Sequence, residues 1–534
     1  MLDKSVMQRL VLAGVLFGLV ASSHAAVKLH GLFGSNMVLQ RDARVPVWGT
    51  AEPGEHVTVS LCGQTVSVVA DVSGKWSATL NAMPAGGPFE MTVAGTVGMA
   101  RTTNILKNVA VGDVWICSGQ SNMGITLNGV KNSSDEIKSA KFPMVRQITV
   151  PMHVQDTPVE NIKEESWAVA KWAVALSNNN VGSFSAVAYF FGRDLNQALN
   201  IPIGLIHSSW AGSYAQSWTT RETLLADPDL RPLYEGPHEW LIDYVKKLDK
   251  GAEITGPWLA AVAKAKAEGK LAPPLPAFEA LLDNSPAAIW YFPSSRYNGM
   301  IAPLIRFPIR GAIWYQGEAN AEQAWLYRKL LPAMIADWRK AWGQGNFPFY
   351  IVQLANYGPP PVVPNESSWA ELREAQSLTA RNVPNCGQAV IIDLGEANDI
   401  HPKNKQDVGK RLSLVARASS YGEKIICSGP VYESMKVDGN HIILNFKKAG
   451  GGLVAKGGAL KQFAIAGADK KFVWADAMIT GNTVVVSSGS VTNPVAVRYA
   501  WANNPEGCNL YNSEDLPASP FRTDDWPMIT HGKR

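Results

Sequence analysis

Hydrophobic and polar positions follow two different rhythms along this chain of 534 residues. Over 27–109, and again over 430–534, apolar and polar residues alternate in short runs separated by Pro, Gly and Ser, a pattern typical of antiparallel strands joined by turns. Over 110–429, wholly apolar runs alternate with longer segments of helical periodicity. The pattern predicts an α/β catalytic or binding unit with a mainly parallel sheet, flanked by an N-terminal and a C-terminal β domain.

Individual elements of the central unit follow from the same pattern. The predicted strands are 114–117, 203–207, 312–315, 349–354 and 389–393, and the predicted helices are 185–199, 322–342, 369–383 and 404–418. In open sheets of this kind, ligands bind beyond the carboxyl ends of the strands. The segment 221–298 breaks the alternation with Lys/Ala-rich and Pro-rich stretches, and it predicts a helical insertion that borders the site.

The first residues have the composition of a targeting segment. Lys4 and Arg9 precede an uncharged apolar run at 10–21, which small residues follow. This pattern predicts a signal peptide over 1–26 and export to the periplasm or the extracellular space. The run is shorter than the ~20 apolar residues that span a bilayer, and no later run is long enough, so we expect no membrane span.

Charge and cysteine content exclude several classes of partner. Lys and Arg number 49 against 45 Asp and Glu, a formal net charge of +4, and no block of like charge occurs. We therefore expect no binding to nucleic acid or anionic lipid. The 5 cysteines are widely spaced, without a Cys-x-x-Cys pair or a nearby histidine cluster, so no zinc site is expected. The 18 tryptophans suit stacking on sugar rings, although most aromatic side chains fill cores. No oligomeric state is predicted.

Ser121 is the first residue that suggests chemistry. It follows the apolar run 114–117, and Gly119 between them permits a sharp turn that projects the hydroxyl beyond the sheet edge. This arrangement suits a nucleophile. The alternative is a helix N-cap, the commoner role of a serine at such a position.

Other strand ends supply the remaining groups that acyl transfer needs. His401, in the loop after the strand 389–393, is the candidate base for Ser121. Gly212 follows the strand 203–207, and Gln316 follows 312–315, so a backbone N–H and a side-chain amide are available to stabilise an oxyanion. Each residue has an ordinary alternative role: a solvated loop histidine, a turn glycine and a capping glutamine.

Several sequence blocks resemble one family. The blocks resemble the sialate O-acetylesterase family, carbohydrate esterases of the SGNH hydrolase superfamily, at Gly119-Gln-Ser-Asn-Met123, Trp314-Tyr-Gln-Gly-Glu-Ala-Asn320, Asp399-Ile-His-Pro402 and Lys405-Gln-Asp-Val-Gly-Lys-Arg-Leu412. Further similar blocks extend the resemblance over nearly all of the mature chain: Asn36 to Arg41, Pro46 to Gly49, Arg296 to Pro303 and Leu516 to Arg522.

The resemblance implies an SGNH-type three-layer sandwich and a role for each candidate residue. Ser121 is then the nucleophile and His401 the general base and later the acid. The oxyanion hole is formed by the backbone N–H groups of Ser121 and Gly212 and by the side chain of Gln316.

The acid that orients the histidine departs from the family pattern. The superfamily places an aspartate three residues before the histidine, where this chain has Asn398. Asp399 is the first choice in its place, and Glu318 is the second. A backbone carbonyl that holds the histidine tautomer, with no acid, is the third alternative.

The function that the resemblance implies is two-step ester hydrolysis through an acetyl-enzyme, with O-acetylated sialic acids as substrates. The alternatives are an acetylesterase for acetylated xylan or another plant polysaccharide, and a non-catalytic carbohydrate-binding protein. A peptidase with the same chemistry is less consistent with the Gly-Gln-Ser-Asn block around Ser121.

Overall fold

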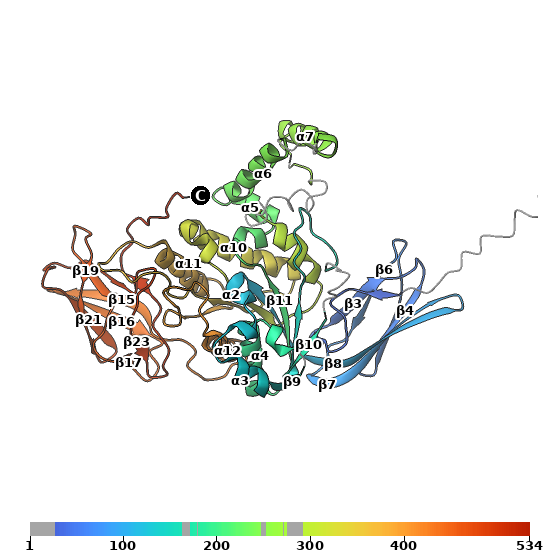
Figure 1. Ribbon diagram of the computed structural model, residues 1–534, viewed down its shortest axis with the longest axis horizontal. Coiled ribbons are helices and arrows are strands. Elements are labelled where there is room, and N and C mark those ends of the chain that lie inside the picture. The colour runs from blue at the N-terminus through green and yellow to red at the C-terminus, as the bar shows by residue number, and fades with distance from the viewer. Residues whose placement is uncertain are drawn as a thin grey trace, which may run out of the picture.

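The computed structural model describes residues 27–162, 171–178, 180–246, 252–270, 272–274 and 292–533. The predicted signal peptide over 1–26 and parts of the predicted insertion lie outside these residues. Figure 1 shows a central unit of strands and helices between two groups of strands, one from each end of the chain.

The N-terminal strands pair as the alternating pattern predicts. In β4 (His56–Leu61), for example, the alternate side chains of Val57, Val59 and Leu61 are buried. A three-stranded antiparallel sheet contains β1 (Lys28–Leu29), β3 (Val45–Thr50) and β6 (Lys75–Leu80). The other strands here are β2 (Val38–Gln40), β4 (His56–Leu61), β5 (Gln64–Val69) and β7 (Gly86–Val97).

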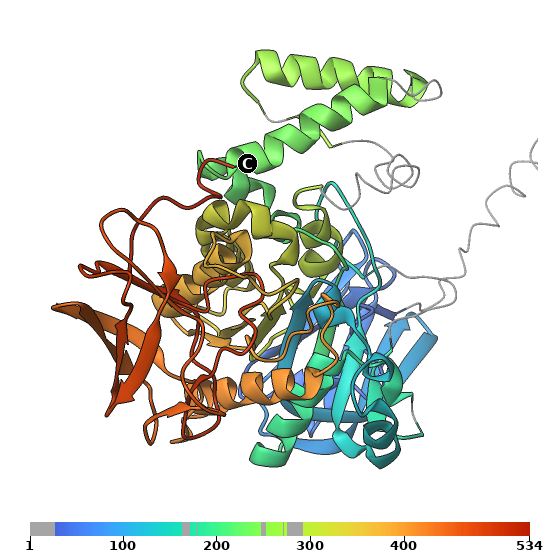
Figure 2. The same cartoon turned by 60° about the vertical axis from the view of Figure 1, so that its left-hand side comes forward.

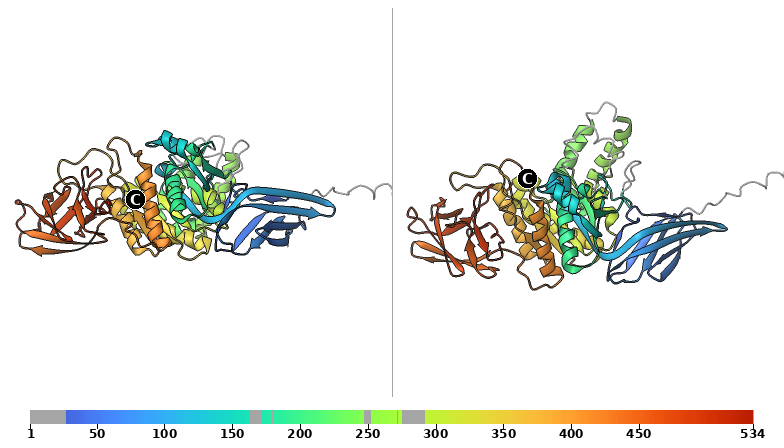
Figure 3. Two further views of the ribbon diagram at one scale, coloured as in Figure 1. Left: turned by 90° about the horizontal axis from the view of Figure 1, so that it is seen from below. Right: turned by 60° about the horizontal axis from the view of Figure 1, so that its bottom comes forward.

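One long strand joins this part to the central unit. β8 runs from Ala100 to Gly119, 20 residues, so the predicted boundary after residue 109 lies inside a continuous strand. Its first half alternates between exposed and partly buried positions, whereas every residue from Val109 onward is buried. The change marks the point where a sheet covered on one face becomes a sheet covered on both. Figure 3 shows β8 paired with β7 as a long ribbon that leaves the central unit.

The central sheet has the strand order β10-β9-β11-β8-β12-β13-β14. Its other strands are β9 (Lys141–Thr149), β10 (Ala173–Leu176), β11 (Ile203–Ser209), β12 (Gly311–Tyr315), β13 (Phe349–Val352) and β14 (Cys386–Ala389). The sheet is mixed: neighbours from β9 to β14 pair parallel, and β10 pairs antiparallel with β9. Both Ser209 and Tyr315 lie opposite Gly119, so the ends of β11 and β12 meet the end of β8.

Helices cover both faces of this sheet. Trp115 and Cys117 of β8 share a buried cluster with α4 (Ala186–Leu199) and α12 (Lys405–Ser420), whereas Ile116 between them belongs to the cluster that contains α10 (Ala324–Trp342) and α11 (Ser368–Asn382). Successive strand residues point to opposite faces, so the two helix pairs lie on opposite sides. The side chains of Ser185, Ser367 and Asn404 cap α4, α11 and α12 by accepting a backbone N–H three residues on.

Short helical turns connect these elements. They are α2 (Ser121–Gly124), η1 (Leu127–Gly129), α3 (Ser133–Ser139), η2 (Val181–Ser183), η3 (Ala215–Trp218), η4 (Tyr297–Ile301), η5 (Ala302–Leu304) and η6 (Glu318–Gln323). The described residues of the predicted insertion include α5 (Arg221–Ala226), α6 (Arg231–Lys246) and α7 (Ala252–Ala267). Figures 1 and 2 show α6 and α7 projecting from one side of the central unit. Among the helices of the described ranges, none is long and apolar enough to cross a membrane.

The central sheet differs from the predicted elements, which include neither β9 nor β10 and misplace β14. The strand predicted at 389–393 is wrong over most of its length, because β14 ends at Ala389. Ile391 and Ile392 are nevertheless buried, one against the central unit and one against the C-terminal strands, so the apolar run reflects burial and not strand pairing. The sequence pattern does not predict β9, because Arg146 interrupts it; this buried guanidinium donates to backbone carbonyls of the N-terminal part, including that of Asn108.

The C-terminal strands form two four-stranded antiparallel sheets and one separate pair. The first sheet has the order β15 (Val431–Asp438), β16 (His441–Lys447), β21 (Thr483–Ser487) and β20 (Asp476–Thr480). The second sheet has the order β19 (Val473–Trp474), β18 (Phe463–Ala466), β22 (Ala496–Tyr499) and β24 (Phe521–Arg522). The separate pair consists of β17 (Leu453–Ala455) and β23 (Leu510–Asn512). The hairpin predicted between β15 and β16 is confirmed, with Asp438 opposite His441.

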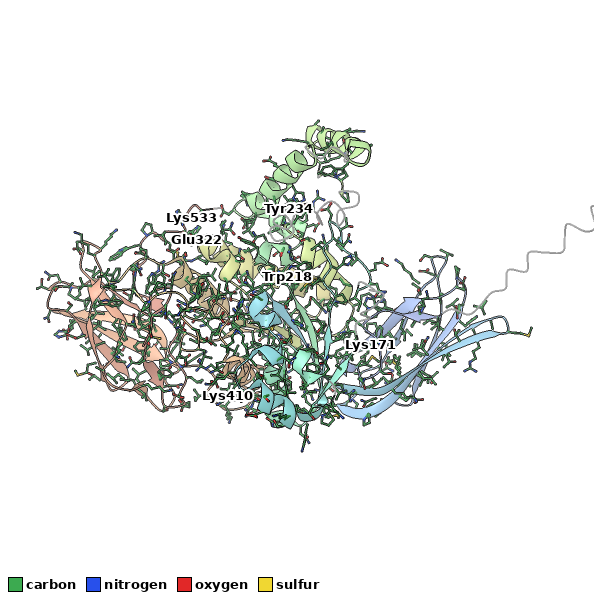
Figure 4. The ribbon with its side chains drawn as sticks, in the orientation of Figure 1. Lys171, Trp218, Tyr234, Glu322, Lys410 and Lys533 are labelled. Atoms are coloured by element: carbon green, nitrogen blue, oxygen red, sulfur yellow. The ribbon has the colours of Figure 1, made fainter. Side chains whose placement is uncertain are left out.

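The C-terminal part is fixed to the central unit through α11. Buried Arg373 donates to the carbonyls of Ala502 and Asn503 at 2.6 and 2.8 Å. The last residues return to the same region, where Lys533 Nζ lies 3.0 Å from Glu322 Oε2. Figure 4 shows these two side chains close together above the central unit. The C-terminal part is therefore fixed to the central unit at α11 and near Glu322.

Candidate active site

The turn after β8 fixes the position of Ser121. Gly119 has φ 139°, and a Cβ at this residue would lie 2.1 Å from the carbonyl oxygen of Tyr315, so only glycine fits. Gln120 donates its N–H to Tyr315 O at 3.0 Å, and Trp210 donates to Gly119 O at 3.1 Å. The turn is thus bonded to the ends of both neighbouring strands.

Ser121 is the first residue of α2, and Gln120 occupies the N-cap position. The alternative of Ser121 as a helix cap is therefore wrong. Its hydroxyl faces another partner: Oγ lies 2.9 Å from Nε2 of His401, which is within hydrogen-bond distance. The structure brings together the two residues that the sequence predicts as nucleophile and base.

The environment of His401 favours a neutral ring that accepts a proton. Partial burial lowers the pKa of His401, Asp399 acts in the opposite direction, and Lys405 and Lys403 lower it further. The His401 side chain is 37% exposed, so substrate and water can reach it. A neutral imidazole whose Nε2 faces a hydroxyl is the arrangement of a general base.

Asp399 lies beside the imidazole without bonding to it. Its Oδ1 is 3.7 Å from Nδ1 of His401, which is an ion-pair distance but too long for a hydrogen bond. The same oxygen accepts the backbone N–H of His401 at 2.8 Å, and Oδ2 pairs with Lys403 Nζ at 3.0 Å. These contacts lower the pKa of Asp399, so the carboxylate is charged beside the ring.

Glu318, the second predicted partner of His401, faces a different residue. Its Oε1 accepts from Nδ2 of Asn122 at 2.6 Å, and its Oε2 is buried. Burial raises the pKa of this carboxyl. Of the two candidates, the structure places Asp399 next to the imidazole and Glu318 behind the nucleophile.

The two predicted backbone donors of the oxyanion hole, Gly212 and Ser121, have N–H groups that bond to no described acceptor. Gly212 has φ 66°, in the left-handed region that glycine tolerates. The loop itself is anchored, because Trp218 Nε1 donates to Ser213 Oγ at 2.9 Å. Figure 4 shows Trp218 in the interior of the central unit.

The predicted donation from the Gln316 side chain to an oxyanion is not supported. Nε2 of this buried residue donates to Ser213 O at 3.2 Å and to Asn320 Oδ1 at 2.7 Å, which uses both of its hydrogens. Its Oε1 accepts from the hydroxyl of Tyr327 at 2.8 Å. The Gln316 side chain thus binds the carbonyl of Ser213, the residue after Gly212. The sequence pattern does not reveal this contact between two strand ends.

Two residues that carry no predicted role complete the surroundings. Asn122 and Lys405 are buried, and Lys405 Nζ donates to Asn122 Oδ1 at 2.5 Å. Both residues lie in the sequence blocks around Ser121 and His401, but nothing in their spacing predicts the contact. In the described parts of the chain, no three His, Cys, Asp or Glu side chains gather as metal ligands would.

Comparison with known proteins agrees with this geometry. The family described as "Carbohydrate esterase, sialic acid-specific acetylesterase" matches residues 287–416. Sialate O-acetylesterase of Mus musculus is 31% identical over an alignment of 535 positions, which covers 91% of this chain and 92% of the mouse protein. The chain belongs to the sialate O-acetylesterase family.

Other members and a solved structure extend the comparison. The human sialate O-acetylesterase is 30% identical over an alignment of 567 positions, which covers 96% of this chain and 97% of the human protein. The crystal structure of a carbohydrate acetylesterase from Xanthomonas citri is 37% identical, with a TM-score of 0.78, and the match covers 93% of this chain and 100% of that chain. As a member of the sialate O-acetylesterase family, this protein is a carboxylic ester hydrolase.

Proposed function

We propose that this protein is a serine esterase that removes O-acetyl groups from carbohydrates, with O-acetylated sialic acids as its first substrate class. The observation that carries the proposal is the 2.9 Å contact between Ser121 Oγ and His401 Nε2. It supplies an activated hydroxyl at the carboxyl edge of the sheet, where α/β folds bind ligands.

The first half of the reaction acylates the enzyme. Ser121 Oγ attacks the acetyl carbonyl carbon while His401 Nε2 takes the hydroxyl proton. The resulting oxyanion is held by the N–H groups of Ser121 and Gly212. When the C–O bond to the sugar breaks, His401 returns the proton to the sugar oxygen, and acetyl-Ser121 remains.

The second half releases acetate. His401 removes a proton from a water molecule, which attacks the acetyl carbonyl and passes through the same oxyanion. The imidazolium then protonates Ser121 Oγ as the acyl bond breaks. No step requires a metal or a cofactor.

The names of its relatives support the substrate class. The mouse and human relatives are called sialate O-acetylesterases. The solved relative has a higher identity, 37%, and is called a carbohydrate acetylesterase without mention of sialic acid. An acetylesterase for acetylated xylan or another plant polysaccharide, the alternative from the sequence, is the second candidate.

The proposal includes two further expectations from the sequence. The central unit is of the SGNH type, supported by helices on both faces of the sheet and by the serine at the end of β8. The protein is exported, and N-terminal sequencing of the secreted form is expected to begin near residue 27.

The decisive experiment measures acetate release from a panel of acetylated sialic acid, acetylated xylan and an aryl acetate. Wild-type enzyme is expected to release acetate, and S121A to release less than about a thousandth as much with an unchanged thermal unfolding profile. S139A, which removes an exposed hydroxyl, is the matched control and is expected to keep full activity. Binding of the sugars without acetate release by the wild type would instead indicate a carbohydrate-binding protein.

A further inference from the structure

A buried polar cluster lies directly behind the Ser121–His401 pair. We call it the Asn122 cluster; it contains Asn122, Glu318, Lys405 and the backbone carbonyl of Ile400. Its members come from the turn after β8, the turn after β12, the start of α12 and the loop that carries His401. The esterase mechanism uses none of them directly.

The amide of Asn122 is fully bonded within this cluster. Nδ2 donates one hydrogen to Glu318 Oε1 at 2.6 Å and the other to Ile400 O at 3.0 Å. Oδ1 accepts from Lys405 Nζ at 2.5 Å. Asn122 is 1% exposed, so water does not compete for these bonds.

Glu318 and Lys405 determine which way this amide faces. As a charged pair, the Glu318 carboxylate only accepts hydrogen bonds and the Lys405 ammonium group only donates them, so rotating the Asn122 amide by half a turn would place oxygen against oxygen and nitrogen against nitrogen. Lys405 is also held from its other side, since its Nζ lies 5.0 Å from the ring centroid of Tyr315. The two groups lock one orientation of the amide.

That orientation connects the nucleophile to the base. Asn122 follows Ser121 in α2, and Ile400 precedes His401, so one side chain bonds the backbone beside one reactive group to the backbone beside the other. Asp399 does not replace this connection, because it lies 3.7 Å from the imidazole nitrogen. The side chains of His401 and Lys403 are 37% and 47% exposed, so the outer side of the loop has few packing contacts to fix the ring.

We propose that Asn122 is the positioning residue for the Ser121–His401 pair, with Glu318 and Lys405 holding its amide in the required orientation. The inference rests on the proposed function, since it assigns to Ser121 and His401 the chemistry described above. It gives Glu318 a role that differs from direct support of the imidazole.

The first test is the kinetics of N122A on an aryl acetate, measured well below its unfolding temperature. Loss of the Ile400 bond lets the His401 loop shift, and kcat is expected to fall at least about 100-fold, with KM within about threefold of wild type. A purely structural role would lower the unfolding temperature and leave kcat of the folded enzyme unchanged.

The double variant N122D/E318Q isolates the bond to Ile400. The carboxylate introduced at position 122 accepts from Lys405 and from the amide introduced at position 318, so those two contacts are retained, but it cannot donate to Ile400 O. The kcat of this variant is expected to stay at least about 30-fold below wild type. E318Q alone keeps an oxygen that accepts from Asn122, and we expect kcat to fall less than about tenfold, whereas E318A falls further.

N512A is the matched control, because Asn512 is also buried and bonds through both ends of its amide, to Ser428 O and Leu516 N. It is expected to unfold at a lower temperature with kcat within about twofold of wild type. Values of kcat within about threefold of wild type in both N122A and N122D/E318Q would overturn the inference. If N122A does not fold, the comparison of E318A with E318Q decides: equal kcat values overturn it. Activity of S121A would instead overturn the proposed function.

Discussion

Nε2 of His401 lies 2.9 Å from Oγ of Ser121, although 280 positions separate the two residues in the chain. Ser121 follows β8 in the middle of the sheet, and His401 follows β14 at its edge. The loop after β14 returns across the carboxyl ends of the strands. Its Ala397 carbonyl accepts the backbone N–H of Gly358, which follows β13, and its Ile400 carbonyl accepts from the side-chain amide of Asn122. The parallel sheet order and this loop together create the reactive pair.

The pH dependence of the reaction follows from the surroundings of His401. Burial lowers its pKa from 6.5, and the base must be neutral to accept the Ser121 proton. We expect kcat/KM to fall with a slope of one as the pH drops through this lowered pKa. Initial rates with an aryl acetate between about pH 4 and 9 measure this profile.

Substitutions of the two charged neighbours should move that profile in opposite directions. Asp399 raises the pKa of His401 and Lys403 lowers it. The acid limb of D399N is therefore expected at a lower pH than in wild type, and that of K403Q at a higher pH. Identical acid limbs in the two variants would mean that another group controls the titration.

Replacement of Asp399 should reduce activity only moderately. Its carboxylate is 35% exposed and 3.7 Å from Nδ1, so it stabilises the imidazolium through a screened charge and not through a buried hydrogen bond. We expect kcat of D399N to fall about tenfold, compared with about 10⁴-fold for a hydrogen-bonded triad aspartate.

H401A provides the reference for this measurement and is expected to lose more than about a thousandfold in kcat. A loss in D399N as large as that in H401A would show that the carboxylate and the imidazole form a tight pair during the reaction.

The turn at Gly119 should tolerate no side chain. G119A places a Cβ 2.1 Å from Tyr315 O and imposes φ 139° on alanine. The steric and backbone strain is expected to lower the free energy of unfolding by about 3 kcal/mol and to displace Ser121. Chemical denaturation and aryl acetate hydrolysis measure the two effects.

The matched control is G489A, at a glycine where an added Cβ meets no atom within 4 Å. It is expected to change the free energy of unfolding by less than about 0.5 kcal/mol and to leave activity intact. Equal stability of the two variants would contradict the assigned role of Gly119.

Much of the architecture follows from local patterns in the sequence. Predicted helices such as 185–199 and 369–383 match α4 and α11 closely, because amphipathic periodicity and capping serines are local signals. The predicted strand at 389–393 is wrong because burial of Ile391 and Ile392 between two units looks like a strand in the sequence. The pattern does not reveal β9, because Arg146 interrupts its apolar run and the carbonyls that bind this residue lie far away in the chain.

By itself, the sequence determined the chemical groups of the site, because a turn that needs glycine places Ser121 after a buried strand and a polar loop carries His401. It also identified the family through its blocks. Only the tertiary structure decided which groups meet: it paired His401 with Ser121, turned Glu318 toward Asn122, and bound both hydrogens of the Gln316 amide to protein acceptors. The physical reason is that hydrogen-bond partners depend on side-chain direction and distance across strand ends, and one chain's residue order contains neither.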